Sequence, residues 1–311
     1  MLRNYYSLEP IDKLLNEPKT LAVIGHTSGT ISTMVNSVSS GLVRLQEQDL
    51  SEVWKVDNGN VEMGVNDDCH WRQSADFLFV STAVPLKEDF ESAAEIAYTR
   101  LLRFIESSGF RHPIRFWNYM PSINYGDGDF EKYKLFCTGR LNGFKTSNYQ
   151  NSDFPAASAV GHHADDLLIY AICSNKPGTH HNNALQVDAF EYPKQYGKTS
   201  PSFARATSFH AGDETLFFIS GTASIIGHET VCEGDLSGQL KTTENNIDQL
   251  LHQVEKTKEH IQTMKVYIRH PEDFSLTEKY LDEHFPNCQK VYLHADICRS
   301  DLLIEIECFC V

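Results

Sequence analysis

The chain has 311 residues, a length that fits about two globular domains. Its hydrophobic content of 41% and aromatic content of 11% are those of a folded protein and exclude disorder over most of the sequence. The formal net charge of −15 argues against a nucleic-acid-binding protein, which needs a basic face. It still allows an anionic small-molecule substrate, because a pocket can concentrate arginines locally.

Short apolar runs rich in β-branched and aromatic residues alternate with amphipathic helical segments along the chain. The first helix is predicted over 88–108, where apolar residues recur at helical spacing and Gly109 ends the pattern. The elements expected around it are, in chain order, strands 19–24 and 76–82, then strand 113–119, helix 129–144, strands 166–173 and 216–222, helix 235–258, strand 262–268, helix 272–284, and strands 290–295 and 302–309.

The sequence contains an internal repeat of roughly 100 residues, much longer than the repeat of a solenoid. The block FPAASAVGHHADDLLIYAIC (154–173) matches FPNCQKVYLHADICRSDLLIEIECFC (285–310). Both open with Phe-Pro, pass through His-Ala-Asp and continue with Asp-Leu-Leu-Ile. Upstream, FLFVSTA matches LFFISGTA, and RHPIRFWNYMPSIN matches IQTMKVYIRHPEDF, so both halves repeat the same order of elements.

Each half therefore has the order β-α-β-α-β, which predicts an α+β fold in which helices cover a mixed sheet. We expect two related halves, residues 1–175 and 176–311, joined by a polar loop segment at 175–186. The first 75 residues are expected to add strands and loops to the first half.

The clearest difference between the halves lies in their last strands. Aligning DLLIYAI with DLLIEIE sets Tyr170 opposite Glu305 and Ile172 opposite Glu307. Successive strand residues face opposite sides, so the two glutamates share one face. A buried carboxylate is costly unless it is paired or its pKa rises, and a raised pKa suits a general acid. The alternative is that both glutamates lie on a solvated sheet face.

Two segments combine arginines with tyrosines in this acidic protein. Such clusters suit a dicarboxylate ligand, because Arg binds carboxylates in a bidentate way and phenols add donors. The alternative is that these residues serve surface packing and ion pairs. The clusters contain Arg115, Asn118, Tyr119, Asn124, Tyr133 and Arg140 in the first segment, and Tyr192, Tyr196, Ser200 and Arg205 in the second.

Metal binding, membrane insertion and disulfide bonding are not expected. His162 and His163 are adjacent, so in a strand they point to opposite faces, and no third ligand follows at a recognisable spacing. No apolar run approaches the about 18 residues of a membrane-spanning helix, and the N-terminus lacks the apolar core of a secretory signal. The eight cysteines show no C-x-x-C spacing, which favours reduced thiols and a cytoplasmic protein.

Together these segments resemble the chorismatase family. The matching blocks are RFWNYMPSINYGDGDFEKYKLFCTGR, FPAASAVG, a Tyr-Pro…Tyr-Gly…Ser-Pro-x-Phe-Ala-Arg-Ala segment over 192–206, LFFISGTASIIGHET and the final LLIEIE. They occur in order over roughly residues 76–311. The second half also resembles the Rid/YjgF superfamily, whose fold the chorismatases share.

The resemblance implies a cofactor-free enzyme that releases pyruvate from chorismate. In the family a glutamate on the last strand protonates the enolpyruvyl methylene, and this acid corresponds to Glu305. Internal displacement then yields 3-hydroxybenzoate, a route associated with a cysteine near the acid, for which Cys298 is the candidate. Water attack instead yields a dihydroxycyclohexadiene carboxylate. The residues expected to bind substrate are Tyr133, Arg140, Tyr192, Tyr196, Arg205, Gly221 and Arg299.

The chain departs from the family pattern before Tyr192, where it has Asn183-Ala184-Leu185-Gln186 and Glu191 in place of a more basic run. The alternative function is a Rid-like protein, either an imine deaminase or a non-catalytic binder of a small ligand. The deaminases hold their substrate with an arginine two residues after Phe-Pro, where this chain has Ala157 and Cys288. Both a monomer and a trimer remain compatible with the sequence.

Overall fold

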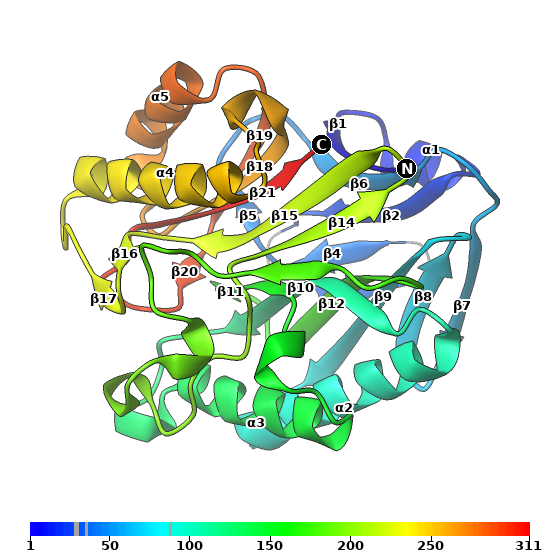
Figure 1. Ribbon diagram of the computed structural model, residues 1–311, viewed down its shortest axis with the longest axis horizontal. Coiled ribbons are helices and arrows are strands. Elements are labelled where there is room, and N and C mark those ends of the chain that lie inside the picture. Colours follow the sequence, from blue (N-terminus) through cyan, green and yellow to red (C-terminus); the bar gives the residue numbers. More distant parts are fainter. Residues whose placement is uncertain (28–30, 35–36, 87–88) are drawn as a thin grey trace.

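A computed structural model describes residues 1–311 except 28–30, 35–36 and 87–88. Within these residues the chain forms two seven-stranded sheets, a five-stranded sheet and a small hairpin (Figure 1). In spatial order, the first sheet contains β20 (Asp296–Ile297), β11 (Ala156–His162), β10 (His112–Pro121), β12 (Asp166–Ser174), β9 (Phe77–Pro85), β8 (Cys69–Gln73) and β7 (Glu62–Asn66). The second contains β13 (Thr179–His181), β14 (Ala206–Ala211), β15 (Glu214–Thr222), β21 (Ile304–Cys310), β18 (Ile261–Ile268), β19 (Gln289–His294) and β5 (Val43–Arg44).

The N-terminal sheet and the hairpin complete the strands. The sheet contains β1 (Leu2–Ser7), β6 (Ser51–Val56), β2 (Thr20–Gly25), β4 (Val38–Ser40) and β3 (Ile31–Thr33), and the hairpin contains β16 (Ile225–Ile226) and β17 (Glu229–Thr230). The helices are α1 (Ile11–Leu15), α2 (Phe90–Ser108), α3 (Lys132–Thr146), α4 (Leu236–Gln253) and α5 (Phe274–His284).

The two large sheets have the same topology, as the repeat predicts. In the first, β9 pairs antiparallel with β12, β12 antiparallel with β10, and β10 parallel with β11. In the second, β15, β21, β18 and β19 pair in the same way. The helices α2 and α4 follow the first strand of each unit, and α3 and α5 precede the parallel strand. The duplicated β-α-β-α-β order is therefore present in three dimensions.

The edge strands cross between the two predicted halves. Strand β20, from the second half of the sequence, pairs with β11 and extends the first sheet. Strand β5, from the N-terminal region, pairs with β19 and extends the second sheet. The division at 175/176 stays a prediction, but each sheet depends on a strand from beyond its own repeat.

The helices differ from the predicted ones mainly at their ends. Helix α2 is capped by the Asp89 side chain, which accepts a hydrogen bond from the Glu91 N–H; of its predicted range, residue 88 lies outside the described residues. Helix α3 begins three residues later than predicted, because Gly128–Phe130 forms a separate 3₁₀ turn. Helix α4 ends at Gln253 rather than 258, because Glu255 adopts a positive φ of 55°.

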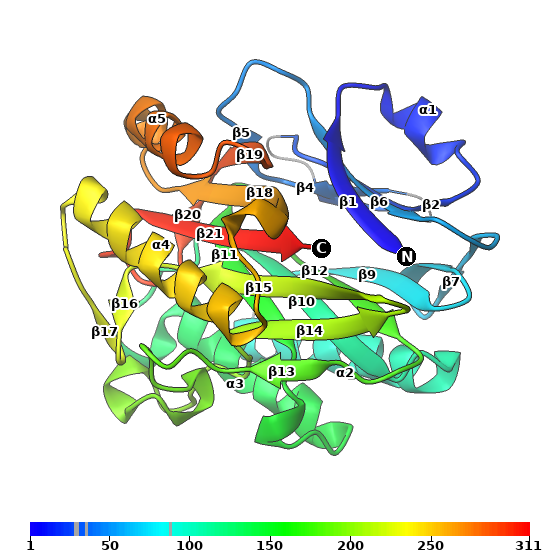
Figure 2. The ribbon, with the colours of Figure 1, turned by 45° about the horizontal axis from the view of Figure 1, so that its top comes forward.

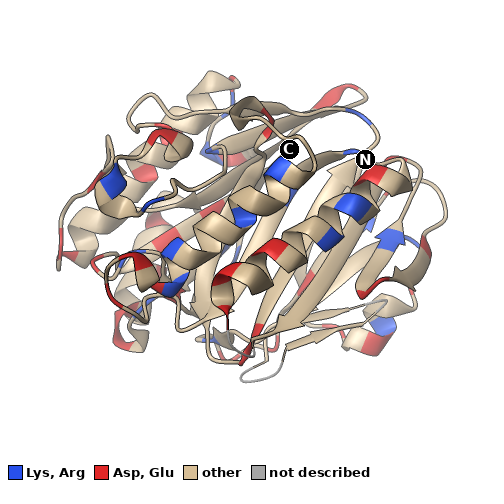
Figure 3. Ribbon diagram, turned by 90° about the horizontal axis from the view of Figure 1, so that it is seen from below, with Lys and Arg blue, Asp and Glu red and all other residues tan. Residues whose placement is uncertain are grey.

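Each large sheet is covered by helices on one face only (Figure 1). One apolar core lies between the first sheet and α2 and α3, and another lies between the second sheet and α4 and α5. The helix-free faces meet in a third core, to which the N-terminal sheet also contributes. Figure 3 shows acidic and basic residues on the helices that cover the face in view.

As predicted, the first 75 residues add strands to the first half, because β7 and β8 extend the first large sheet. The N-terminal sheet, however, packs against both large sheets. The indole of Trp54 on β6 lies 5.7 Å from the ring of Trp117 on β10 and 5.2 Å from that of Phe309 on β21, measured between centroids. The Tyr6 hydroxyl donates to the carbonyl of Met264 on β18 at 2.9 Å. Figure 2 shows this sheet lying over the others. Its apolar face covers surface that either large sheet alone would leave in water.

Among the described residues, no helix combines the length and the apolar character needed to cross a membrane.

Helices α2 and α3 approach closely because of two glycines on α3. A Cβ atom at Gly139 would lie 2.1 Å from the Glu91 carbonyl oxygen, and one at Gly143 would lie 2.5 Å from Tyr98 Cβ. We expect Gly139→Ala to reduce the free energy of unfolding by about 1–3 kcal/mol, because overpacking forces the helices apart. Chemical denaturation measures this change. In the control Gly25→Ala the new methyl meets Ile11 at an ordinary 3.4 Å, and equal effects in both variants would contradict this account.

Candidate active site

A cavity of about 400 Å³ lies between the two large sheets, and residues from both halves line it. The structure brings all nine predicted site residues to this one cavity. They are Glu305 and Cys298, predicted as catalytic, and Tyr133, Arg140, Tyr192, Tyr196, Arg205, Gly221 and Arg299, predicted to bind substrate. Asn124 from the first arginine–tyrosine cluster lines it too, whereas Asn118 and Tyr119 of that cluster are buried in β10 without lining it.

Glu305 lies on β21 and is only 4% exposed. The alternating pattern of the strand is as predicted, because Ile304, Ile306 and Cys308 pack into the core beneath α4 and α5. Glu305 and Glu307 therefore point the other way, between the sheets. Both are buried, so the alternative of a solvated sheet face is wrong.

A β-bulge in β15 makes room for the Glu305 side chain. The register of β15 with β21 shifts between Ile219 and Thr222, whereas β9 in the first half pairs with β12 residue for residue. A Cβ atom at Gly221 would lie 1.9 Å from Glu305 Oε1, so any larger residue there would have to displace the Glu305 carboxyl. The Ser220 hydroxyl accepts from the Ala157 N–H at 3.0 Å and thereby joins the bulge to β11.

Burial and, to a smaller extent, the neighbouring Glu307 raise the pKa of Glu305 to about 8, although Arg115 and Arg205 act in the opposite direction. Glu305 makes no hydrogen bond to any residue that the structure describes. It is therefore a neutral carboxylic acid at neutral pH and holds a proton at the wall of the cavity.

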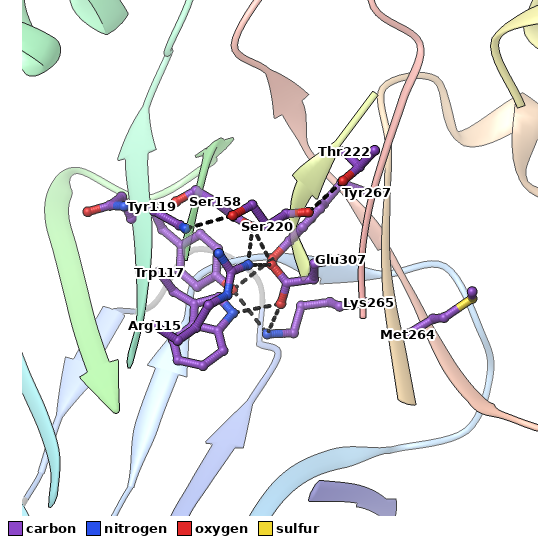
Figure 4. A network of polar contacts seen from close by, with 12 residues as sticks. Arg115, Trp117, Tyr119, Ser158, Ser220, Thr222, Met264, Lys265, Tyr267 and Glu307 are labelled. Atoms are coloured by element: carbon purple, nitrogen blue, oxygen red, sulfur yellow. Dashed lines mark hydrogen bonds and ion pairs between the residues drawn. The ribbon is translucent and has the colours of Figure 1, made fainter. Parts of the chain in front are cut away.

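Glu307 lies two residues further along β21 and has the opposite environment (Figure 4). Its carboxylate is 2.8 Å from Arg115 Nη2 and 3.1 Å from Lys265 Nζ. It accepts hydrogen bonds from Trp117 Nε1 at 2.6 Å and from the Ser158 hydroxyl. Burial alone would raise the pKa of Glu307, but Lys265, Arg115 and the donors outweigh it and hold the pKa below its ordinary value.

No pattern in the sequence marks Lys265 as part of the site. It lies in the apolar strand β18 with its side chain 2% exposed, 2.7 Å from Glu52 Oε2 on the N-terminal sheet. Burial lowers the pKa of Lys265, but Glu307 and Glu52 raise it more strongly, so the amine stays charged. Lys265 therefore links Glu52 of the N-terminal sheet to Glu307 of the second sheet.

Three arginines bring guanidinium groups to the cavity. Arg140 on α3 is 1% exposed, and its Nε and Nη2 have no partner among the described residues. The Nε of Arg205 and the Nη2 of Arg299 are also unpartnered there. A buried donor without an acceptor is costly, so these nitrogens are available to an anionic ligand.

Tyrosines of the second cluster orient two of these arginines. The Tyr192 hydroxyl accepts from Arg205 Nη2 at 2.7 Å, and the Arg299 guanidinium lies over the Tyr196 ring, 4.0 Å from its centroid. The Ser200 hydroxyl donates to the Tyr192 carbonyl at 2.9 Å. Burial raises the pKa of Tyr133 well above its ordinary value, so this phenol stays protonated.

The segment that carries Cys298 and Arg299 is held by Arg269, which sequence reasoning did not select. The Arg269 guanidinium donates to the carbonyls of Ile297 and Arg299 at 2.9 Å and to that of Leu302 at 2.7 Å. It also pairs with Asp296 and approaches the Asn124 amide oxygen. Burial raises the pKa of Cys298 to about 12, so its thiol is neutral.

Two family models match the chain. One, described as "Chorismatase FkbO/Hyg5-like, N-terminal", matches residues 52–173, and the other, described as "Endoribonuclease L-PSP", matches residues 202–311. The two models fall on the two repeats, one on each. The predicted α+β fold and the relation of the second half to the Rid/YjgF fold are confirmed.

Curated proteins and a solved structure support the match to the chorismatase family model. A 3-hydroxybenzoate synthase from Streptomyces hygroscopicus is 33% identical over 83% of this chain and 80% of its own length. A chorismatase from Streptomyces rapamycinicus is 31% identical over 91% of this chain and 89% of its own length. A chorismatase crystal structure superposes with a TM-score of 0.89 at 25% identity, covering 100% of this chain and 98% of that one. The chain belongs to the chorismatase family.

The close fit of Glu305 against Gly221 gives a direct test of the site geometry. In Gly221→Ala the new methyl must displace the Glu305 carboxyl, which a crystal structure of the variant would show, together with a loss of about 1–3 kcal/mol in unfolding free energy. The control is Ala223→Gly, which alters the same wall without adding an atom. An unmoved Glu305 in Gly221→Ala would contradict the packing described above.

Proposed function

We propose that this protein cleaves the enolpyruvyl ether of chorismate and releases pyruvate, with 3-hydroxybenzoate as the second product. The observation that carries the proposal is the buried carboxyl of Glu305, in the same cavity as three arginines whose guanidinium nitrogens lack a partner among the described residues. Burial raises the pKa of this carboxyl to about 8. The names of the similar proteins support it. A cytoplasmic location belongs to the same proposal.

The cavity suits the charge and size of the substrate. Chorismate carries two carboxylates, and Arg140, Arg205 and Arg299 can neutralise them from different walls of the cavity. A volume of about 400 Å³ lies within the range of small-molecule sites. The carboxylates of a bound chorismate would accept hydrogen bonds from the guanidinium nitrogens that have no partner among the described residues.

The reaction begins with transfer of the Glu305 proton to carbon. The π electrons of the enol ether form the new C–H bond at the terminal methylene, leaving an oxocarbenium ion and a Glu305 carboxylate. This carboxylate lies beside the cation and stabilises it. The acid suits the step because it is protonated at neutral pH and accepts no competing hydrogen bond from a described residue.

The fate of the oxocarbenium ion decides the second product. Internal displacement gives pyruvate and 3-hydroxybenzoate without net consumption of water, whereas hydrolysis consumes water and gives a dihydroxycyclohexadiene carboxylate. Cys298 lines the same cavity as Glu305, and the Glu305 carboxyl adds to the effect of burial in raising the pKa of the Cys298 thiol. We therefore assign Cys298 to the internal route, as a neutral thiol rather than as a thiolate nucleophile.

We expect Glu305→Gln to lower kcat for pyruvate release by about 10²–10⁴-fold, because glutamine cannot supply the proton. Pyruvate is measured with a coupled lactate dehydrogenase assay, and the aromatic product by chromatography and mass spectrometry. Glu131→Gln, at another lining glutamate, is the control and should retain activity. Chorismate binding without pyruvate release by the wild type would identify a non-catalytic binder instead.

We expect Cys298→Ala to redirect the product from 3-hydroxybenzoate towards the dihydroxycyclohexadiene carboxylate, with pyruvate release retained. The product ratio at full conversion measures the change. Cys288→Ala, which removes a partly buried thiol at a position that does not line the cavity, is the matched control. An unchanged ratio in Cys298→Ala would remove Cys298 from the mechanism.

A further inference from the structure

Glu307 occupies a position where equivalent residues of the two repeats converge. In the first sheet Arg115 lies opposite Ile172, and in the second sheet Lys265 lies opposite Glu307. The repeat alignment makes Ile172 the counterpart of Glu307, so Arg115 and Lys265 are also counterparts. Both cations contact the Glu307 carboxylate.

The hydrogen-bond donors follow the same relation. Trp117 lies opposite Tyr170, and Tyr267 lies opposite Glu305, so these two aromatic residues are counterparts as well. The Trp117 indole donates to Glu307 at 2.6 Å, and the Tyr267 hydroxyl donates to it at 3.1 Å. Each repeat thus contributes one cation and one aromatic hydrogen-bond donor to the Glu307 carboxylate.

We propose that Glu307 is a positioning residue for Glu305, an anion fixed beside the acid that keeps it in the neutral form required for proton transfer. This inference rests on the proposed role of Glu305. Two carboxyl groups on one face of a strand disfavour double ionisation, and the group with the better partners ionises first. The cations and donors bind Glu307, whereas Glu305 has no hydrogen bond from a described residue.

Ser158 lies at the junction of the two carboxyl groups. Its hydroxyl donates to Glu307 and accepts from Arg115. It also lies 3.0 Å from where a Cβ atom would stand at Gly221, the residue that contacts Glu305. With its proton donated to Glu307, this hydroxyl has none to give to a Glu305 carboxylate. The local donors therefore favour one charge on Glu307 and none on Glu305.

Groups from several elements act on Glu305. Arg115 on β10 and Arg205 before β14 lower its pKa, whereas Glu307 on its own strand raises it. The Cys298 thiol and the Tyr133 phenol also face it, and both are neutral at neutral pH. Removal of the Glu307 charge should therefore change the pKa of Glu305 most directly.

The test is the pH dependence of kcat/KM for pyruvate release, whose basic limb reports ionisation of the free-enzyme acid. The wild type should lose activity as the pH rises through about 8. In Glu307→Gln the limb should move to lower pH by on the order of one to two units, because Arg115 and Lys265 are no longer neutralised. Activity should then fall about tenfold near pH 7.5 and recover in more acidic buffer.

Arg115→Gln should shift the basic limb of the pH profile in the opposite direction, to higher pH, because this cation lowers the pKa of Glu305. Glu244→Gln is the matched control, since Glu244 is a buried, ion-paired glutamate on α4 that does not line the cavity. The basic limb of the pH profile should not move in this variant. A uniform loss of activity with an unmoved limb in Glu307→Gln would overturn the proposal and leave Glu307 a structural residue.

A second readout does not depend on activity. Carbon-13 NMR of protein labelled at the glutamate carboxyl carbons, with Glu305→Gln used to assign the signal, follows the Glu305 titration directly. If the wild type released no pyruvate but Glu307→Gln still lowered the Glu305 midpoint, the proposed function would fail and this inference would stand. Equal midpoints in the two proteins would overturn the inference whatever the activity.

Discussion

The structure depends on the ion pairs that Glu307 makes between the large sheets. Arg115 comes from the first sheet, Lys265 from the second, and Glu52 on the N-terminal sheet binds Lys265 from the other side. Removing charges from water is costly, and these four groups meet that cost by neutralising one another. The core then contains two cations and two carboxylates in balance. A further buried carboxyl, Glu305, forms no ion pair with any residue that the structure describes and stays protonated.

The duplication explains how such a site forms in one chain. Two sheets of the same topology present their helix-free faces to each other, and their equivalent strands bring equivalent side chains to the centre. The halves then differ at a few positions. Glu305 and Glu307 stand where the first half has Tyr170 and Ile172, and a bulge at Gly221 interrupts β15 but not its counterpart β9. The topology common to both halves forms the walls of the cavity, and these differences place the acid Glu305 in it.

Much of this arrangement can be predicted from the sequence because it is encoded in local periodicity. Strand alternation places Glu305 and Glu307 on one face, and the repeat comparison marks both as unusual. Lys265 was not found, because a lysine within an apolar strand gives no sign of which distant carboxylate it meets. Arg269 was missed for a similar reason, since its partners belong to the segment 296–302 and to Asn124. The role of the N-terminal sheet likewise depends on contacts such as that of Trp54 with Trp117, which have no sequence spacing.

The proposed chemistry requires that Glu305 holds a proton at neutral pH inside the cavity lined by the three arginines. Infrared difference spectroscopy of the wild type against Glu305→Gln tests it most directly, because a protonated carboxyl group has a C=O stretching band that a carboxylate lacks. We expect the wild type to show this extra band at neutral pH and to lose it as the pH rises through about 8. A wild-type spectrum without the band at neutral pH would contradict the account.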